Sequence, residues 1–225
     1  GMSLDMTYFQ DADGRSYYAW QQLGATYIAK MDPKDPAHVT SSPVRIVTPE
    51  YAWNAAIAEG PNVTLRDGKL YLMFSGSGVG KTYTTGLAVA DAAGSDLTDP
   101  ASWTALNYPI QKSGPFNGEM QLGTGHGMWS EDEDGNQVYV FHAYATKNLG
   151  SVNATGRDMF VRRVHWAADG MPVFDMSSSE ELASKTVSVT VKVADDTVTV
   201  DKTDLSKALA SAKQLRESDY TAASW

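Results

Sequence analysis

Residues 63–74, VTLRDGKLYLMF, contain an apolar strand, an Asp-Gly turn and a second strand rich in apolar and aromatic residues. The same arrangement occurs at residues 7–20, TYFQDADGRSYYAW, and at residues 128–142, MWSEDEDGNQVYVFH. Asp-Gly between two apolar runs is a strong β-hairpin signal, because the turn needs residues that tolerate a positive φ. We therefore expect three β-hairpins, each with a glycine in its turn: Gly14, Gly68 and Gly135.

The three turn glycines lie 54 and 67 residues apart along the chain. A repeat of this length has room for four strands, which is typical of a β-propeller blade. The sequence therefore predicts an all-β fold with about three four-stranded antiparallel blades, over residues 4–47, 60–110 and 121–174. Because closed propellers have about 4–8 blades, we expect a partial β-propeller that belongs to a larger ring.

The composition of the chain excludes several classes of partner. Its 225 residues carry a net charge of −9, which argues against a nucleic-acid partner because phosphate binding needs a basic face. There is no cysteine, so disulfides and thiolate metal sites are excluded. No apolar run reaches the roughly 18 residues of a membrane span, and no signal peptide is visible at the start of the chain. We expect no membrane insertion.

The composition changes after residue 176, which predicts three parts. Residues 1–176 form the partial propeller, and residues 177–200 are expected to be a linker with an exposed strand. From residue 201 the apolar residues follow a helical period, with Leu205 and Leu209 on one face. Residues 201–225 are therefore expected to form a short helical tail.

The loop at residues 75–82, SGSGVGKT, superficially resembles a phosphate-binding loop. That motif requires Gly, four residues and then Gly-Lys-Ser/Thr, but the first position here is Ser75. A helix should also follow, so that its N-terminus meets the phosphates, and residues 83–86 are a poor helix start. We interpret the segment as a glycine-rich loop between two strands.

Three polar residues lie at or near the starts of the first strands of the three blades: Asp5, Glu59 and His126. Glu59 precedes Gly60, which allows close approach of a ligand, and Pro61, which fixes φ. Such a carboxylic acid at the mouth of a propeller suits general acid catalysis. The alternatives are a solvated loop glutamate, an exposed aspartate of the first strand and a structural histidine.

At these residues the chain resembles glycoside hydrolase family 43, the five-bladed propeller enzymes that cleave arabinofuranosides and xylosides. Residues 58–63, AEGPNV, match the family's general-acid motif, which implies that Glu59 is the acid. Residues 4–7, LDMT, resemble the strand whose aspartate orients the acid and tunes its pKa, which implies this role for Asp5. Residues 125–127, GHG, resemble the axial histidine motif near a central metal ion or water.

The resemblance implies an inverting arabinofuranosidase or xylosidase that requires no cofactor, with an axial calcium ion as a candidate held through water near His126. The family arginine that commonly reaches the substrate corresponds to Arg157. The residues expected to line the sugar site are Trp53, His126, Trp129 and Arg157.

The family's general base is an aspartate in the first of five blades, and this blade has no counterpart here. The chain resembles the last three blades, so we expect it to be inactive or impaired on its own, and to self-associate through exposed blade faces. The alternative is a non-catalytic module that binds carbohydrate or protein through its open edges. Residues 200–225 resemble the start of a FIVAR module, which implies a secreted or cell-surface parent protein.

Overall fold

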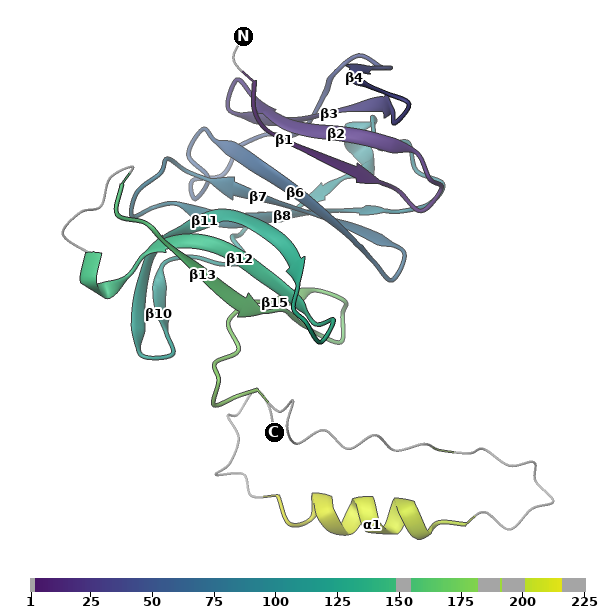
Figure 1. The fold of residues 1–225 in the computed structure, drawn as a ribbon, viewed down its shortest axis with the longest axis vertical. Coiled ribbons are helices and arrows are strands. Elements are labelled where there is room, and N and C mark those ends of the chain that lie inside the picture. Colours follow the sequence, from purple (N-terminus) through teal and green to yellow (C-terminus); the bar gives the residue numbers. More distant parts are fainter. Residues whose placement is uncertain (1–2, 149–154, 182–190, 192–200, 216–225) are drawn as a thin grey trace. The chain divides into compact units, whose positions relative to one another are not determined.

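The computed structural model of the chain describes residues 3–148, 155–181, 191 and 201–215 (Figure 1). The chain divides into two compact units, Gly1–Asp175 and Met176–Trp225. The exposed strand expected within residues 177–200 lies outside the described residues apart from 177–181 and 191.

The first sheet contains five strands, all paired antiparallel. They are β1 (Ser3–Gln10), β2 (Ser16–Gln22), β3 (Ala25–Asp32), β4 (Asp35–Val39) and β5 (Val44–Val47). Strands β4 and β5 both pair with β3, whereas the sequence predicted only β5 there. The additional strand forms because Asp32 accepts a hydrogen bond from the backbone of Lys34 at 2.9 Å, which closes a tight turn between β3 and β4.

The second sheet has the four strands that the sequence predicted. They are β6 (Ala58–Arg66), β7 (Lys69–Gly76), β8 (Thr84–Asp91) and β9 (Thr104–Ala105), with a 3₁₀ turn at Pro100–Ser102 before β9. Every residue of β7 after Lys69 is buried, so this strand lies between two layers of side chains.

The third sheet is also four-stranded. It contains β10 (Gly114–Phe116), β11 (Glu119–Glu131), β12 (Gln137–Tyr144) and β13 (Asp158–Arg163), with a 3₁₀ turn at Thr146–Asn148. The sequence analysis did not anticipate β10, which joins β11 through Asn117 and Gly118, both with positive φ. The end of the predicted third blade forms a separate small sheet of β14 (His165–Trp166) and β15 (Pro172–Val173).

The three predicted hairpins are present as β1–β2, β6–β7 and β11–β12. Their turn glycines adopt the expected left-handed conformation, with φ of +78° at Gly14, +76° at Gly68 and +77° at Gly135. Strand β6 contacts both β1 and β11. The first strands of the three hairpins are therefore neighbours (Figure 1). These findings confirm the predicted all-β, partial-propeller fold.

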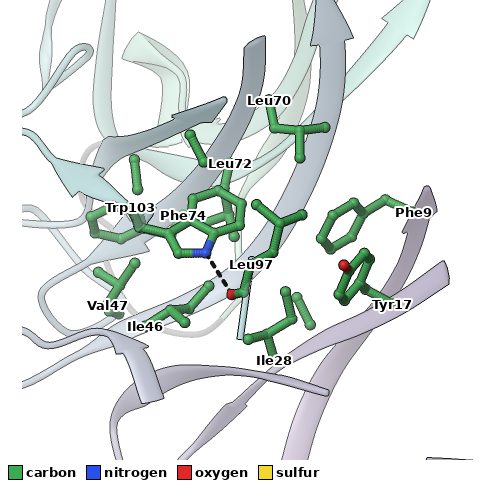
Figure 2. Packing of buried hydrophobic residues seen from close by; sticks show 14 of the residues in the cluster. Phe9, Tyr17, Ile28, Ile46, Val47, Leu70, Leu72, Phe74, Leu97 and Trp103 are labelled. Carbon is green, nitrogen blue, oxygen red and sulfur yellow. Dashed lines mark hydrogen bonds between the residues drawn. The ribbon is translucent and has the colours of Figure 1, made fainter. Parts of the chain in front are cut away.

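Two clusters of buried side chains hold the first unit together. The first cluster includes Phe9, Tyr17, Ile28, Leu72 and Trp103, and Figure 2 shows the Trp103 indole donating a hydrogen bond to the Leu97 carbonyl. The second cluster contains Met73, Tyr139, Phe141, Val164 and Phe174. Leu72 and Met73 belong to different clusters because successive strand residues point to opposite faces of the sheet. Strand β7 therefore joins the two cores.

The second unit contains one described helix, α1 (Thr203–Ala212). It begins where the Asp201 carboxylate accepts hydrogen bonds from the backbone and hydroxyl groups of Thr203. This agrees with the helical tail that the apolar period predicted. Among the described helices, none is long and apolar enough to cross a membrane.

Candidate active site

A β-bulge interrupts the first strand of each of the three predicted hairpins. The pairing register shifts at residues 5–6 in β1, 60–61 in β6 and 126–127 in β11. Each bulge contains a residue with positive φ, namely Asp5 at +60°, Gly60 at +58° and His126 at +51°. A bulge redirects the side chains around it and interrupts the backbone hydrogen-bond ladder. These strands can therefore point polar side chains toward one another.

Asp5 connects the three strands. Its Oδ2 accepts a hydrogen bond from the Gly60 backbone at 3.2 Å, and its Oδ1 lies 3.8 Å from Nε2 of His126. Glycine is needed at position 60 because a Cβ there would lie 3.3 Å from the His126 ring, on a left-handed backbone. The structure therefore places Asp5, the Glu59–Gly60 segment and His126 at the same end of the blades.

Tyr83, which the sequence analysis did not single out, links Glu59 to His126. Its hydroxyl donates a hydrogen bond to Oε1 of Glu59 at 2.7 Å and lies 3.5 Å from Nδ1 of His126. The side chain is completely buried, and burial next to the charge of Glu59 raises the pKa of Tyr83 far above its ordinary value of 10. Tyr83 therefore stays protonated and acts as a hydrogen-bond donor to Glu59.

Ser75, near the end of β7, holds the backbone of His126. Its hydroxyl oxygen accepts a hydrogen bond from the His126 backbone at 2.6 Å. Ser75 is itself completely buried. It therefore fixes the bulge that carries His126 next to Tyr83.

His142 and Arg157 extend the group along the third blade. Nη1 of Arg157 lies 2.9 Å from Nε2 of His142, and the His142 ring stacks on Tyr83 with ring centroids 5.5 Å apart. Burial, assisted by the charges of Arg157 and His126, lowers the pKa of His142 from 6.5 to about 4. His142 is thus neutral near pH 7, so Nε2 accepts from the guanidinium.

The predicted sugar-site residues do not all lie together. Arg157 and His126 line a cavity of about 540 Å³ on the third blade. Trp53 is half-buried on the second blade, where its ring stacks on Phe74 and its indole donates to the Asn107 carbonyl. Trp129 packs with Trp166 and Phe174, and its indole donates to the Tyr71 carbonyl. Trp129 therefore contacts the second core cluster.

The described residues do not fit a directly bound calcium ion. Among them, no group of three or more His, Cys, Asp or Glu side chains is placed to hold a metal. Calcium takes about six to eight oxygen ligands, whereas His126 offers nitrogen and Asp5 one carboxylate.

Two curated relatives are arabinofuranosidases. The extracellular exo-alpha-(1->5)-L-arabinofuranosidase of Streptomyces avermitilis is 32% identical over 185 residues, which covers 76% of this chain and 37% of the relative. Alpha-L-arabinofuranosidase 43 of Humicola insolens is 31% identical over 186 residues, with the same shares covered. The chain thus spans less than half the length of these relatives.

Solved structures agree with this similarity. The alpha-L-arabinofuranosidase from Lactobacillus brevis superposes with a TM-score of 0.67 at 29% identity, covering 77% of this chain and 55% of that one. A thermostable family-43 glycoside hydrolase gives a TM-score of 0.64 at 23% identity, covering 77% and 58%. The family model of glycosyl hydrolases family 43 matches residues 1–172. The chain belongs to glycosyl hydrolases family 43.

Proposed function

We propose that this chain supplies the general-acid part of an inverting glycosidase site that acts on arabinofuranosides or xylosides. The observation that carries the proposal is the placement of Glu59, held by the hydroxyl of buried Tyr83 next to Asp5 and His126. The names of the two curated relatives support the arabinofuranoside as substrate.

In this mechanism Glu59 is the general acid. Its carboxyl O–H bond breaks as the proton passes to the glycosidic oxygen, and the electrons of the breaking C–O bond stay on that oxygen. Asp5 holds the backbone of Gly60, directly after Glu59, and so orients the acid. Arg157 is the candidate for binding the sugar, with His142 fixing its guanidinium.

An inverting reaction also needs a general base about 6.5–9.5 Å from the acid, with a water between base and sugar. Within the described residues, Asp5 is already engaged with Gly60 and His126, and we assign no other residue to the base. We therefore infer that these 225 residues alone turn over slowly or not at all, as expected of three blades out of five.

The proposal also covers the C-terminal tail and the cellular location of the parent protein. Helix α1 is compatible with a helical module of the FIVAR type in residues 201–225. The Streptomyces avermitilis relative is named as extracellular, which supports a secreted or cell-surface parent protein.

Turnover of p-nitrophenyl α-L-arabinofuranoside and β-xyloside tests the function. We expect the 225-residue chain to fall about 10²–10⁴-fold below a complete enzyme, since that is the contribution of a general base. In a protein completed by the two upstream blades, Glu59→Gln should abolish most turnover of poor leaving groups and spare activated aryl glycosides. Glu133→Gln, at an exposed turn, is the matched control. Robust turnover by the chain alone, unaffected by Glu59→Gln, contradicts both assignments.

A second candidate function is non-catalytic carbohydrate binding. The cavity of about 540 Å³ next to Arg157 and His142 favours it, because a guanidinium fixed beside exposed Met159 offers both polar and apolar contacts to a sugar. Calorimetric titration of the chain with arabino-oligosaccharides distinguishes the two functions. Binding that Arg157→Ala removes, without turnover in a completed protein, supports the binding module.

A further inference from the structure

We propose that Tyr83 is a positioning residue for Glu59: it holds Oε1 of the carboxyl group, so that Oε2 carries the proton given to the leaving group. The inference rests on the proposed function and adds to it one residue, which acts through Glu59. It is built on three properties of the structure, namely a hydrogen bond from a buried donor, a closely packed tyrosine ring and the chemistry of a carboxyl group.

The hydrogen bond from Tyr83 is directed at the candidate acid. The phenol hydrogen donates to Oε1 of Glu59 at 2.7 Å. Tyr83 is completely buried, and a hydrogen bond to a carboxylate is stronger where water is excluded. The phenol hydrogen is therefore committed to the carboxyl group of Glu59.

Two neighbouring residues of the third sheet pack against the Tyr83 ring. Gly125 allows close packing, because a Cβ at that position would lie 2.5 Å from two carbons of the ring. His142, which pairs with Gly125 across β11 and β12, stacks its ring on Tyr83 at 5.5 Å, with only 8° between the planes. Arg157 in turn holds His142. The phenol hydroxyl therefore has little freedom to follow Glu59 if the carboxyl group rotates.

The fixed donor decides which carboxyl oxygen carries the transferable proton. A protonated carboxyl oxygen is a poor acceptor, so an Oε1 that accepts from Tyr83 leaves the proton on Oε2. In the described residues no hydrogen bond to Oε2 competes with this arrangement. A general acid displaced by about 1 Å can lose about 10²-fold in rate. We therefore expect Tyr83→Phe to lower kcat for unactivated arabinosides about 10- to 100-fold.

The kinetic test compares Tyr83→Phe with Tyr139→Phe. Tyr139 is also completely buried, but its hydroxyl contacts Thr85 at 2.6 Å within the second core cluster, away from Glu59. The measurement uses the chain or, if that is inactive, the chain completed by the upstream blades of a relative. We expect Tyr83→Phe to slow unactivated glycosides far more than p-nitrophenyl glycosides with little change in KM, while Tyr139→Phe keeps the wild-type ratio.

The proposal is wrong if Tyr83→Phe slows turnover of unactivated and p-nitrophenyl glycosides equally, or if its leaving-group dependence is the same as that of Tyr139→Phe. This holds even if the enzyme is active.

An NMR measurement on the 225-residue chain needs no turnover. The hydroxyl proton of Tyr83, assigned by its loss in Tyr83→Phe, should move upfield in Glu59→Gln because the acceptor loses its charge. It should stay in place in Glu133→Gln. If Glu59→Gln leaves this resonance unchanged, the proposed hydrogen bond is wrong. If the resonance shifts as expected but a completed protein shows no glycosidase turnover, the hydrogen bond is confirmed and the proposed function is wrong.

Discussion

Gly60→Ala tests whether the three bulged strands depend on close backbone contact at the site. Gly60 has a φ of +58°, and its N–H donates to Asp5. An added Cβ would lie 3.3 Å from Cε1 and Nδ1 of the His126 ring. The substitution therefore imposes a left-handed backbone on alanine and presses on the histidine at the same time.

The size of the effect follows from these two contributions. A left-handed conformation costs a non-glycine residue about 1–2 kcal/mol. Moving the His126 side chain off its rotamer to relieve the contact costs about 0.5–1.5 kcal/mol, and the half-exposed ring has room to move. A total near 2 kcal/mol should lower Tm by about 4–8 °C, because a domain of this size loses about 2–4 °C per kcal/mol.

Gly14→Ala is the matched control for this substitution. Gly14 has a φ of +78°, but a Cβ there would meet no atom within 4 Å. Thermal unfolding of both variants should show a loss in each and a larger loss in Gly60→Ala, whose His126 ring signals should also move in NMR spectra. If Gly60→Ala loses no more stability than Gly14→Ala and the His126 signals stay unchanged, the assigned packing at the site is incorrect.

The pKa of His142 is about 4 in the folded protein and 6.5 ordinarily, so the unfolded chain takes up a proton first as the pH falls. The contribution of His142 to the unfolding free energy should be fully present above pH 6.5 and should decline toward pH 4. In urea unfolding, His142→Asn should reduce this decline; an unchanged pH dependence would mean that other groups cause it. Asp11→Ala should cost about 2–4 kcal/mol in thermal unfolding, because it removes a fully buried, multiply bonded carboxylate. Asp132→Ala, at the equivalent but partly exposed turn position, should cost less, and equal losses would contradict this burial argument. Met128, Met159 and Val161 are exposed on strands β11 and β13, on either side of β12 in the third sheet, and predict self-association, which light scattering should detect and Met159→Lys should weaken; a clean monomer at high concentration would count against it.

Local sequence signals predicted most of the fold. The hairpins follow from Asp-Gly turns, whose left-handed glycine is a property of a few neighbouring residues. The same kind of signal occurs at Asn117-Gly118, which joins β10 to β11 in a hairpin that was not predicted. The sequence does not indicate strand β4, because residues 35–39 lack an apolar pattern, and in the structure they are exposed. Its pairing with β3 depends on the turn that Asp32 closes.

The candidate site was predictable only in part. Asp5, Glu59 and His126 attracted attention because they lie at corresponding places in three repeated blades. Tyr83 follows the glycine-rich loop at residues 75–82 and carries no local signal, because its packing depends on Gly125 in a distant strand. The sugar-site assignment of Trp129 stays a prediction. Its partly buried indole packs with Trp166 and Phe174, and a sequence pattern does not distinguish a sugar-stacking tryptophan from a packing one.

The hydrogen bond to the candidate acid forms within one blade. Glu59 lies on β6 and Tyr83 directly before β8, so their contact belongs to the second blade. Asp5 and His126 come from the neighbouring blades on either side. In the proposed function the general base and the rest of the sugar pocket lie outside these three blades, so the contacts of the acid do not depend on them. For this reason the tyrosine–glutamate contact can be measured in the chain by itself, independently of whether it turns over a substrate.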